Sequence, residues 1–143
     1  MSKYVVRYGC MRTLGVFSTR GGDSYRRGIR VVARTNRGLE VGEILCEATE
    51  EALKQLKDPP YGQILRPMTA EDHNELTHIQ SQERLEFEAC QRSVSVLALQ
   101  MQLVDIEHLF GGERIVVYYL SEDRVDFREL VKQLASEFQT RID

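Results

Sequence analysis

The chain has 143 residues, of which 42% are hydrophobic, 29% charged and 8% aromatic. This composition excludes disordered, collagen-like and disulfide-framework proteins, and the length suits one compact domain or two very small ones. No apolar run approaches the roughly 20 residues that cross a bilayer, and the first residues lack the apolar stretch of a signal peptide. We therefore expect a cytoplasmic protein that makes no use of a membrane.

The three cysteines, Cys10, Cys46 and Cys90, are far apart in the sequence and form no CxxC pair. An odd number of separated cysteines is typical of reduced thiols in a reducing compartment. Free cysteine is among the residue types most often buried, so we expect partly buried thiols with a structural role. The three histidines are expected to be surface or hydrogen-bonded residues, because His73 and His78 do not share a helix face and His108 stands alone. The sequence indicates no cofactor and no metal site.

Charge is distributed unevenly along the chain. The formal net charge is −3, but residues 1–47 carry nine basic and four acidic groups, whereas the remainder carries ten basic and eighteen acidic groups. Eight of those first nine basic groups are arginines, whose planar donors suit phosphate and stack on bases. We predict a nucleic-acid-binding surface, of RNA or DNA, formed by Arg7, Arg12, Arg20, Arg26, Arg27, Arg30, Arg34 and Arg37.

These arginines also have two other interpretations. They can dock on the acidic remainder of the same chain or on a partner, or they can keep the edge of a sheet soluble. Tyr4, Tyr8 and Tyr25 are interleaved with the arginines, and such rings either stack on bases or pack within the sheet.

The first part of the chain predicts short strands separated by glycine turns, over residues 3–10, 13–19, 29–35 and 39–46. This pattern is typical of a small barrel or a curled sheet. A short helix is expected over 50–57, and the Asp-Pro-Pro-Tyr-Gly sequence at 58–62 predicts a linker. We therefore place a basic β unit at residues 1–62 and a second unit at 63–143.

The second unit is predicted as α-β-β-α with one long helix. That helix spans about 69–100, begins at a capping pair of Thr69 and Asp72, and carries one apolar stripe from residue 87 onward. Its acidic first half is either solvated or packed on a partner. Strands at 103–110 and 114–120 flank a Gly-Gly turn, and the second strand, apolar on both faces, should be interior.

A final amphipathic helix begins near Asp126, which is expected to cap it with Glu129 as reciprocal partner. Residues 140–143 read as the start of another strand. The predicted fold class is therefore α+β: an N-terminal small β-barrel-like sheet followed by an α-β-β-α unit.

One long stretch of the second unit carries a family resemblance. It reads Met-Gln-Leu-Val-Asp-Ile-Glu at 101–107, Arg-Val-Asp-Phe-Arg-Glu-Leu-Val at 124–131 and Phe-x-Thr-Arg-Ile at 138–142. This resembles the C-terminal domain of the polymerase-suppressor (PSP-one) family, which includes the bacterial RicT/YaaT proteins. The runs Gly-Leu-Glu-Val-Gly-Glu at 38–43 and Arg-Pro-Met-Thr-Ala-Glu-Asp at 66–72 resemble further family segments, so nearly the whole chain is covered.

The resemblance implies a non-enzymatic regulatory factor. It also implies that the two units together form a single domain of the PSP-one type. RicT-like proteins act in a complex with two small helical subunits and influence messenger RNA processing by a ribonuclease. Some eukaryotic relatives bind RNA. The RicT group also has a cysteine-rich tail whose thiols hold iron–sulfur clusters, but Cys10, Cys46 and Cys90 do not match those positions, so we expect no cluster on them.

We interpret the family motif around Arg124, Asp126, Phe127, Arg128 and Glu129 as structural, with Arg128 free to pair with Glu107 or Glu129. The chain has no nucleophile elbow, P-loop or zinc ribbon, so an enzyme is not expected. The favoured function is a regulatory or adaptor protein of RNA metabolism that contacts nucleic acid through its arginines. The alternative is a purely protein-binding scaffold in a multi-subunit complex.

Overall fold

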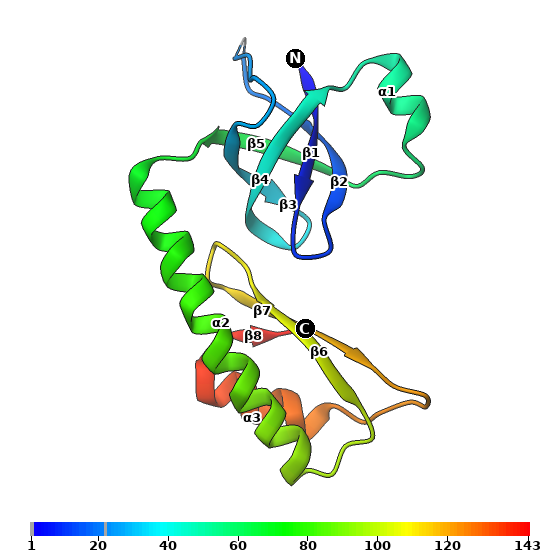
Figure 1. The fold of residues 1–143 in the computed structure, drawn as a ribbon, viewed down its shortest axis with the longest axis vertical. Coiled ribbons are helices and arrows are strands. Elements are labelled where there is room, and N and C mark those ends of the chain that lie inside the picture. The colour runs from blue at the N-terminus through cyan, green and yellow to red at the C-terminus, as the bar shows by residue number, and fades with distance from the viewer. Residues whose placement is uncertain (1, 22) are drawn as a thin grey trace. The chain divides into compact units, whose positions relative to one another are not determined.

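The computed structural model describes residues 2–21 and 23–143, and its mixed α and β architecture confirms the predicted fold class. The chain divides into two compact units, with the boundary between His73 and Asn74. Figure 1 shows a closed barrel of strands in the first unit and a three-stranded sheet with helices in the second. Each unit has a hydrophobic core of its own.

The first unit is a five-stranded closed barrel in the order β1-β2-β5-β3-β4. All neighbouring strands are antiparallel except β2 and β5, which run parallel. Its strands are β1 (Lys3–Tyr8), β2 (Thr13–Ser18), β3 (Arg30–Thr35), β4 (Gly38–Glu47) and β5 (Tyr61–Pro67). The helix α1 (Glu50–Gln55) lies between β4 and β5 and begins at Thr49, whose hydroxyl accepts the Ala52 backbone N–H. The four predicted strands and the short helix are confirmed.

The fifth strand is the element that the sequence analysis missed. The predicted linker at 58–62 runs into β5, which pairs with β2 from Val16 and Tyr61 onward and with β3 as far as Pro67. The two prolines at 59 and 60 do not end the β unit. They precede a strand, where a missing N–H removes no ladder hydrogen bond. The barrel therefore closes through residues beyond the expected boundary at 62.

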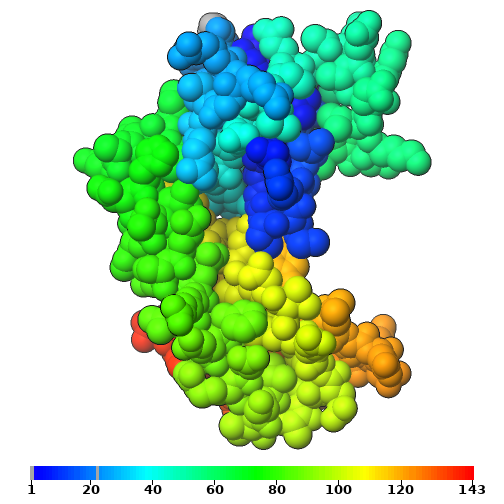
Figure 2. Space-filling model, in the orientation of Figure 1, coloured from blue at the N-terminus to red at the C-terminus, as the bar shows by residue number. Residues whose placement is uncertain are grey.

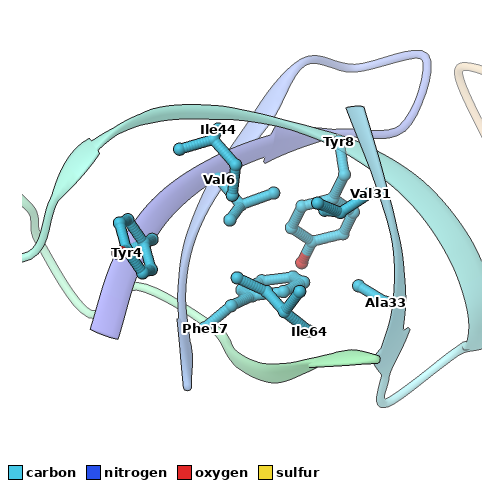
Figure 3. Packing of buried hydrophobic residues seen from close by; sticks show 8 residues of the cluster. All are labelled: Tyr4, Val6, Tyr8, Phe17, Val31, Ala33, Ile44 and Ile64. Carbon is cyan, nitrogen blue, oxygen red and sulfur yellow. The ribbon is translucent and has the colours of Figure 1, made fainter. Parts of the chain in front are cut away.

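Apolar side chains fill the barrel. Figure 3 shows Tyr4, Val6, Tyr8, Phe17, Val31, Ala33, Ile44 and Ile64 pointing into one interior. The rings of Tyr8 and Phe17 contact each other with centroids 5.3 Å apart. Along β1 and β3 these residues occupy alternate positions, as side chains on one face of a strand must. Of the two roles left open for Tyr4 and Tyr8, packing is the one that the structure shows, since both rings are buried.

The long helix α2 (Ala70–Val96) begins where the sequence predicted and ends about one turn earlier. The Asp72 backbone N–H donates to the Thr69 hydroxyl, and the Thr69 N–H donates to the Asp72 carboxylate, so the reciprocal capping box is confirmed. Arg66 adds a 2.7 Å ion pair to the same carboxylate. The helix stops before Ala98, whose φ of 53° lies in the left-handed region.

The second unit contains most of α2 with a three-stranded sheet in the order β6-β7-β8. Its other elements are β6 (Gln102–His108), β7 (Arg114–Leu120), α3 (Arg128–Phe138) and β8 (Arg141–Ile142). The predicted interior position of β7 is confirmed, because β6 pairs antiparallel on one side and β8 pairs parallel on the other. Cys90, Ile106, Ile115, Leu130 and Leu134 form the buried core, with the apolar stripe of α2 packed against it.

Two local predictions in this unit were wrong. The turn between β6 and β7 is longer than two residues, since Leu109 and Arg114 are the last bonded pair and Gly112 donates back to Leu109. The last helix begins after Phe127 rather than Asp126, and Phe127 makes no side-chain capping bond. Asp126 instead accepts the backbone N–H of Arg128 from just outside the helix.

Candidate nucleic-acid interface

Four of the predicted arginines belong to one segment of the barrel. Arg20, Arg26 and Arg27 lie in the connection between β2 and β3, and Arg30 begins β3. All four are exposed, and none forms an ion pair with any residue that the structure describes. We call these four residues the β2–β3 arginine cluster. Figures 1 and 2 show the segment at the end of the barrel where the chain begins.

The backbone of this connection is held by the rest of the barrel. The Gly28 N–H donates to the Ile44 carbonyl, the Ile44 N–H donates to the Ile29 carbonyl, and the Ile29 N–H closes a turn on Arg26. Arg27 also reaches the Leu45 carbonyl with one guanidinium nitrogen at 3.2 Å. The cluster is therefore presented on an anchored loop, and none of its four guanidinium groups has a side-chain partner among the described residues.

Two of the predicted arginines instead form ion pairs with glutamates of strand β4. Arg37 pairs bidentately with Glu40, whose side chain is only 4% exposed and which also accepts the Thr35 hydroxyl. Arg7 pairs with Glu43 at 2.6 Å. The carboxylate partners of these two arginines lie within residues 1–47 and not in the acidic remainder of the chain.

The remaining two arginines lie elsewhere on the barrel. Arg12 is in the turn between β1 and β2, with a φ of 54°, and Arg34 lies near the β3–β4 turn. In Figure 1 both turns lie at the end of the barrel opposite the β2–β3 connection. The eight predicted residues therefore do not form one continuous surface. Among the residues that the structure describes, the β2–β3 arginine cluster is the segment that brings together four of these arginines without an ion pair.

The segment at 38–43 that carries a family resemblance has a structural explanation. Glu40 and Glu43 are the two ion-pair partners just described. Gly42 lies so close to β1 that a Cβ there would meet the Val6 side chain at 2.5 Å. The segment therefore fixes the β1–β4 and β3–β4 contacts of the barrel, and no exposed reactive group results from it.

The motif at 124–129 makes an exposed ion pair at the start of α3. Arg128 donates to both oxygens of Asp126, with the shortest distance at 2.7 Å, and remains 90% exposed. The Arg128 side chain holds the pKa of Asp126 down at about 2. The expected pairing of Arg128 with Glu107 or Glu129 was wrong. Its guanidinium pairs instead with Asp126, two residues earlier in the chain.

The cysteines divide into two groups. Cys90 is buried in the core of the second unit, and burial raises the pKa of its thiol to about 11, as expected of a structural residue. Cys10 and Cys46 are exposed, so the expectation of partly buried thiols was wrong for these two. Cys10 lies in the β1–β2 turn and Cys46 lies at the end of β4, on opposite ends of the barrel strands.

His108 in the second unit has a buried side chain. The His108 ring bonds the Glu86 carboxylate through Nδ1 at 2.8 Å and lies 3.3 Å from the Gly112 carbonyl through Nε2. Its backbone N–H donates to Glu83. The hydrogen bond to Glu86 raises the pKa of His108, and burial raises that of Glu83. The prediction that His108 is a hydrogen-bonded residue is confirmed. Its partners lie 22 and 25 residues away, too far for local sequence patterns to indicate.

A metal site and a membrane-spanning helix are both absent from the part of the chain that the structure describes. Among residues 2–21 and 23–143, no three His, Cys, Asp or Glu side chains are grouped so that they could hold a metal ion. In the same part of the chain, no helix has the length and apolar character to cross a membrane.

The chain is thus a basic closed barrel followed by an α-β-β-α-β unit, and the second unit contains the motif at 124–129. Residues 62–143 match the family model described as the PSP1 C-terminal conserved region, so the chain belongs to the PSP1 family. The chain is 38% identical over 119 residues to the stage 0 sporulation protein YaaT of Bacillus subtilis, across 79% of this chain and 41% of that protein. The resemblance seen in the sequence is confirmed.

A second relative is more distant. An uncharacterized protein of Schizosaccharomyces pombe, PB7E8.02, is 32% identical over 79 residues, which cover 55% of this chain and 10% of that protein. The chain thus spans less than half the length of either curated relative. No solved structure matched the chain.

Proposed function

We propose that the protein is a non-enzymatic regulatory or adaptor protein of RNA metabolism that binds single-stranded RNA through the β2–β3 arginine cluster. One observation carries the proposal: Arg20, Arg26, Arg27 and Arg30 gather four cations in one anchored segment, with no carboxylate partner among the described residues. Arginine without an internal partner is suited to phosphate contacts. The likeness to the stage 0 sporulation protein of Bacillus subtilis supports a regulatory role.

Non-enzymatic action and a cytoplasmic location belong to the same proposal. Three of the titratable groups with shifted pKa values, His108, Glu83 and Asp126, each have a hydrogen-bond or ion-pair partner. A catalytic site instead brings such groups together around an open pocket. The exposed thiols of Cys10 and Cys46 suit a reducing compartment.

The test is a binding measurement with a short labelled single-stranded RNA at low salt. We expect the wild-type protein to bind and the triple variant R26E/R27E/R30E to lose binding by at least a hundredfold, since three phosphate contacts become repulsive. The matched control is R84E/R92E/R124E, which changes the net charge equally on the second unit. Loss of binding in both variants, or in neither, would contradict a role for the cluster.

A protein-binding scaffold remains the second candidate, and one observation favours it. An apolar pocket of about 310 Å³ opens between β7 and α3, where Tyr119 and Val131 are partly exposed. Small helical subunits and a ribonuclease are the partners that the family resemblance suggests for this role. Affinity purification from the native host would recover such partners in stoichiometric amounts. Recovery of the protein alone would count against the scaffold.

A further inference from the structure

A small pocket adjoins the β2–β3 arginine cluster in the first unit. It has a volume of about 340 Å³ and is lined by Asp23, Ser24, Tyr25, Arg26, Ile29 and Pro67. This volume lies at the lower end of the range for small-ligand sites. Tyr25, Ile29 and Pro67 give the lining aromatic and apolar surface, and Asp23, Ser24 and Arg26 give it polar and charged groups. The pocket therefore offers both a flat aromatic ring and polar groups to a ligand.

The aromatic wall is fixed by the barrel core. The Tyr25 backbone N–H donates to the hydroxyl of Tyr4 at 3.1 Å, and the two rings meet edge to face with centroids 5.7 Å apart. Tyr4 is itself only 1% exposed. Tyr25 and Ile29 also pack against the barrel core. A ring held in this way loses little entropy when a ligand stacks on it.

The charges at the pocket decide which part of a nucleotide can enter. Asp23 would repel a phosphate placed beside it in the pocket, whereas Arg26, which also lines the pocket, would attract a phosphate on its own side. The phosphates on either side of a bound nucleotide would instead meet the guanidinium groups of Arg26 and its neighbours. A base has a flat face for Tyr25 and polar edges for Asp23 and Ser24. Single-stranded RNA is read in this manner, by stacking and by bonds to exposed base edges.

We propose that this pocket binds one nucleobase of a single-stranded RNA, that Tyr25 stacks on it, and that Asp23 selects guanine. The proposal rests on the proposed function and names the group recognised at that surface. Guanine presents two adjacent donors, N1–H and the N2 amine, to a carboxylate. Uracil presents a single N–H flanked by two carbonyl oxygens, which a carboxylate repels.

The test compares an oligouridine with the same oligouridine carrying one central guanosine. For the wild-type protein we expect about tenfold tighter binding of the guanosine-containing strand, the size of one good base contact. The variant Asp23→Asn should reduce this ratio to about one while it keeps or improves the affinity for oligouridine. Equal affinity of the wild-type protein for the two strands would overturn the proposal.

Tyr25 is tested with a matched pair of variants. Tyr25→Leu should weaken binding of both strands about tenfold through loss of stacking, whereas Tyr25→Phe, which keeps the ring, should bind as the wild type does. Circular dichroism checks that the leucine variant is folded. Equal binding by the leucine and phenylalanine variants would contradict stacking.

Failure of this proposal can be told apart from failure of the proposed function. If RNA binds through the arginines with no guanosine preference, the pocket proposal is wrong and the proposed function stands. If no RNA binds, guanosine monophosphate and uridine monophosphate are titrated separately against the labelled protein. Shifts of the Tyr25 and Ile29 amide resonances with the guanosine nucleotide alone would support the pocket, and their absence with both would overturn it.

Discussion

At the scale of single residues, the barrel depends on a buried carboxylate. Glu40 accepts the Thr35 hydroxyl and both donors of Arg37, so every polar atom of this group has a partner. Glu40→Ala should lower the free energy of unfolding by about 2–4 kcal/mol, because a half-buried guanidinium and a buried hydroxyl lose their acceptor. Urea denaturation measures this change.

The control for this prediction is the neighbouring ion pair. Glu43 and Arg7 are each about one-third exposed. Glu43→Ala should therefore cost less than about 1 kcal/mol, as partly solvated pairs do. Equal losses in the two variants would show that burial of Glu40 is not what makes its pair important.

The raised pKa of His108 predicts that the free energy of unfolding depends on pH. Its pKa is raised, chiefly by the hydrogen bond to Glu86, so the native state holds this proton more tightly than the unfolded chain does. The stabilisation is complete below the unfolded pKa near 6.5 and is lost as pH rises through the folded pKa. The free energy of unfolding of the wild type, relative to His108→Gln, should therefore fall as pH rises above 6.5.

The difference between the two proteins isolates this histidine, because the other titrating groups are common to both. Nuclear magnetic resonance of the His108 ring gives the folded pKa directly. Parallel pH profiles, or a folded pKa below 6.5, would contradict the role of Glu86.

At the scale of elements, closure of the barrel depends on β5. Gly62 lies so close to its neighbours that a Cβ would meet the Arg34 carbonyl at 2.8 Å and the Phe17 ring at 2.9 Å. Gly62→Ala should cost about 2–3 kcal/mol of stability, since backbone cannot move aside easily. The adjacent Tyr61 is exposed, so Tyr61→Ala should cost less than about 1 kcal/mol. Thermal denaturation of both variants compares them.

The start of α2 makes a second prediction at this scale. Thr69 and Asp72 satisfy each other's backbone N–H groups. Thr69→Ala should lower the free energy of unfolding by about 1 kcal/mol, and Thr69→Ser, which keeps the hydroxyl, should restore most of it. An alanine variant as stable as the wild type would show that the capping bonds contribute nothing.

Elements were predictable from the sequence where local signals decide them. Strands β1 to β4 follow from β-branched runs between glycine turns, and the capping box at Thr69 gave the start of α2. β5 was missed because Pro59 and Pro60 resemble a linker, and only its partners β2 and β3 make it a strand. The divided placement of the arginines was unpredictable for the same reason. Arg37 pairs with a buried glutamate, whereas Arg30 has no ion pair among the described residues. This difference arises from tertiary contacts, which the local sequence does not reveal.

At the scale of the whole molecule, the structure shows which of the basic groups in residues 1–47 are paired with carboxylates. The basic excess of residues 1–47 does not spread evenly over the barrel, because Arg7 and Arg37 are neutralised by Glu43 and Glu40. Four of the seven basic groups in residues 1–47 that form no ion pair among the described residues belong to the β2–β3 arginine cluster. The central claim is therefore that a polyanion contacts this segment of the barrel and not the opposite end.

The salt dependence of RNA binding tests this claim most directly. Each phosphate contact contributes about 0.7 to the slope of log affinity against log salt for a single strand. Relative to wild type, R26Q/R27Q/R30Q should reduce that slope by about 2, whereas R12Q/R34Q, at the other end, should leave it unchanged. An unchanged slope in the triple variant, or an equal reduction per arginine in the double variant, would contradict the account.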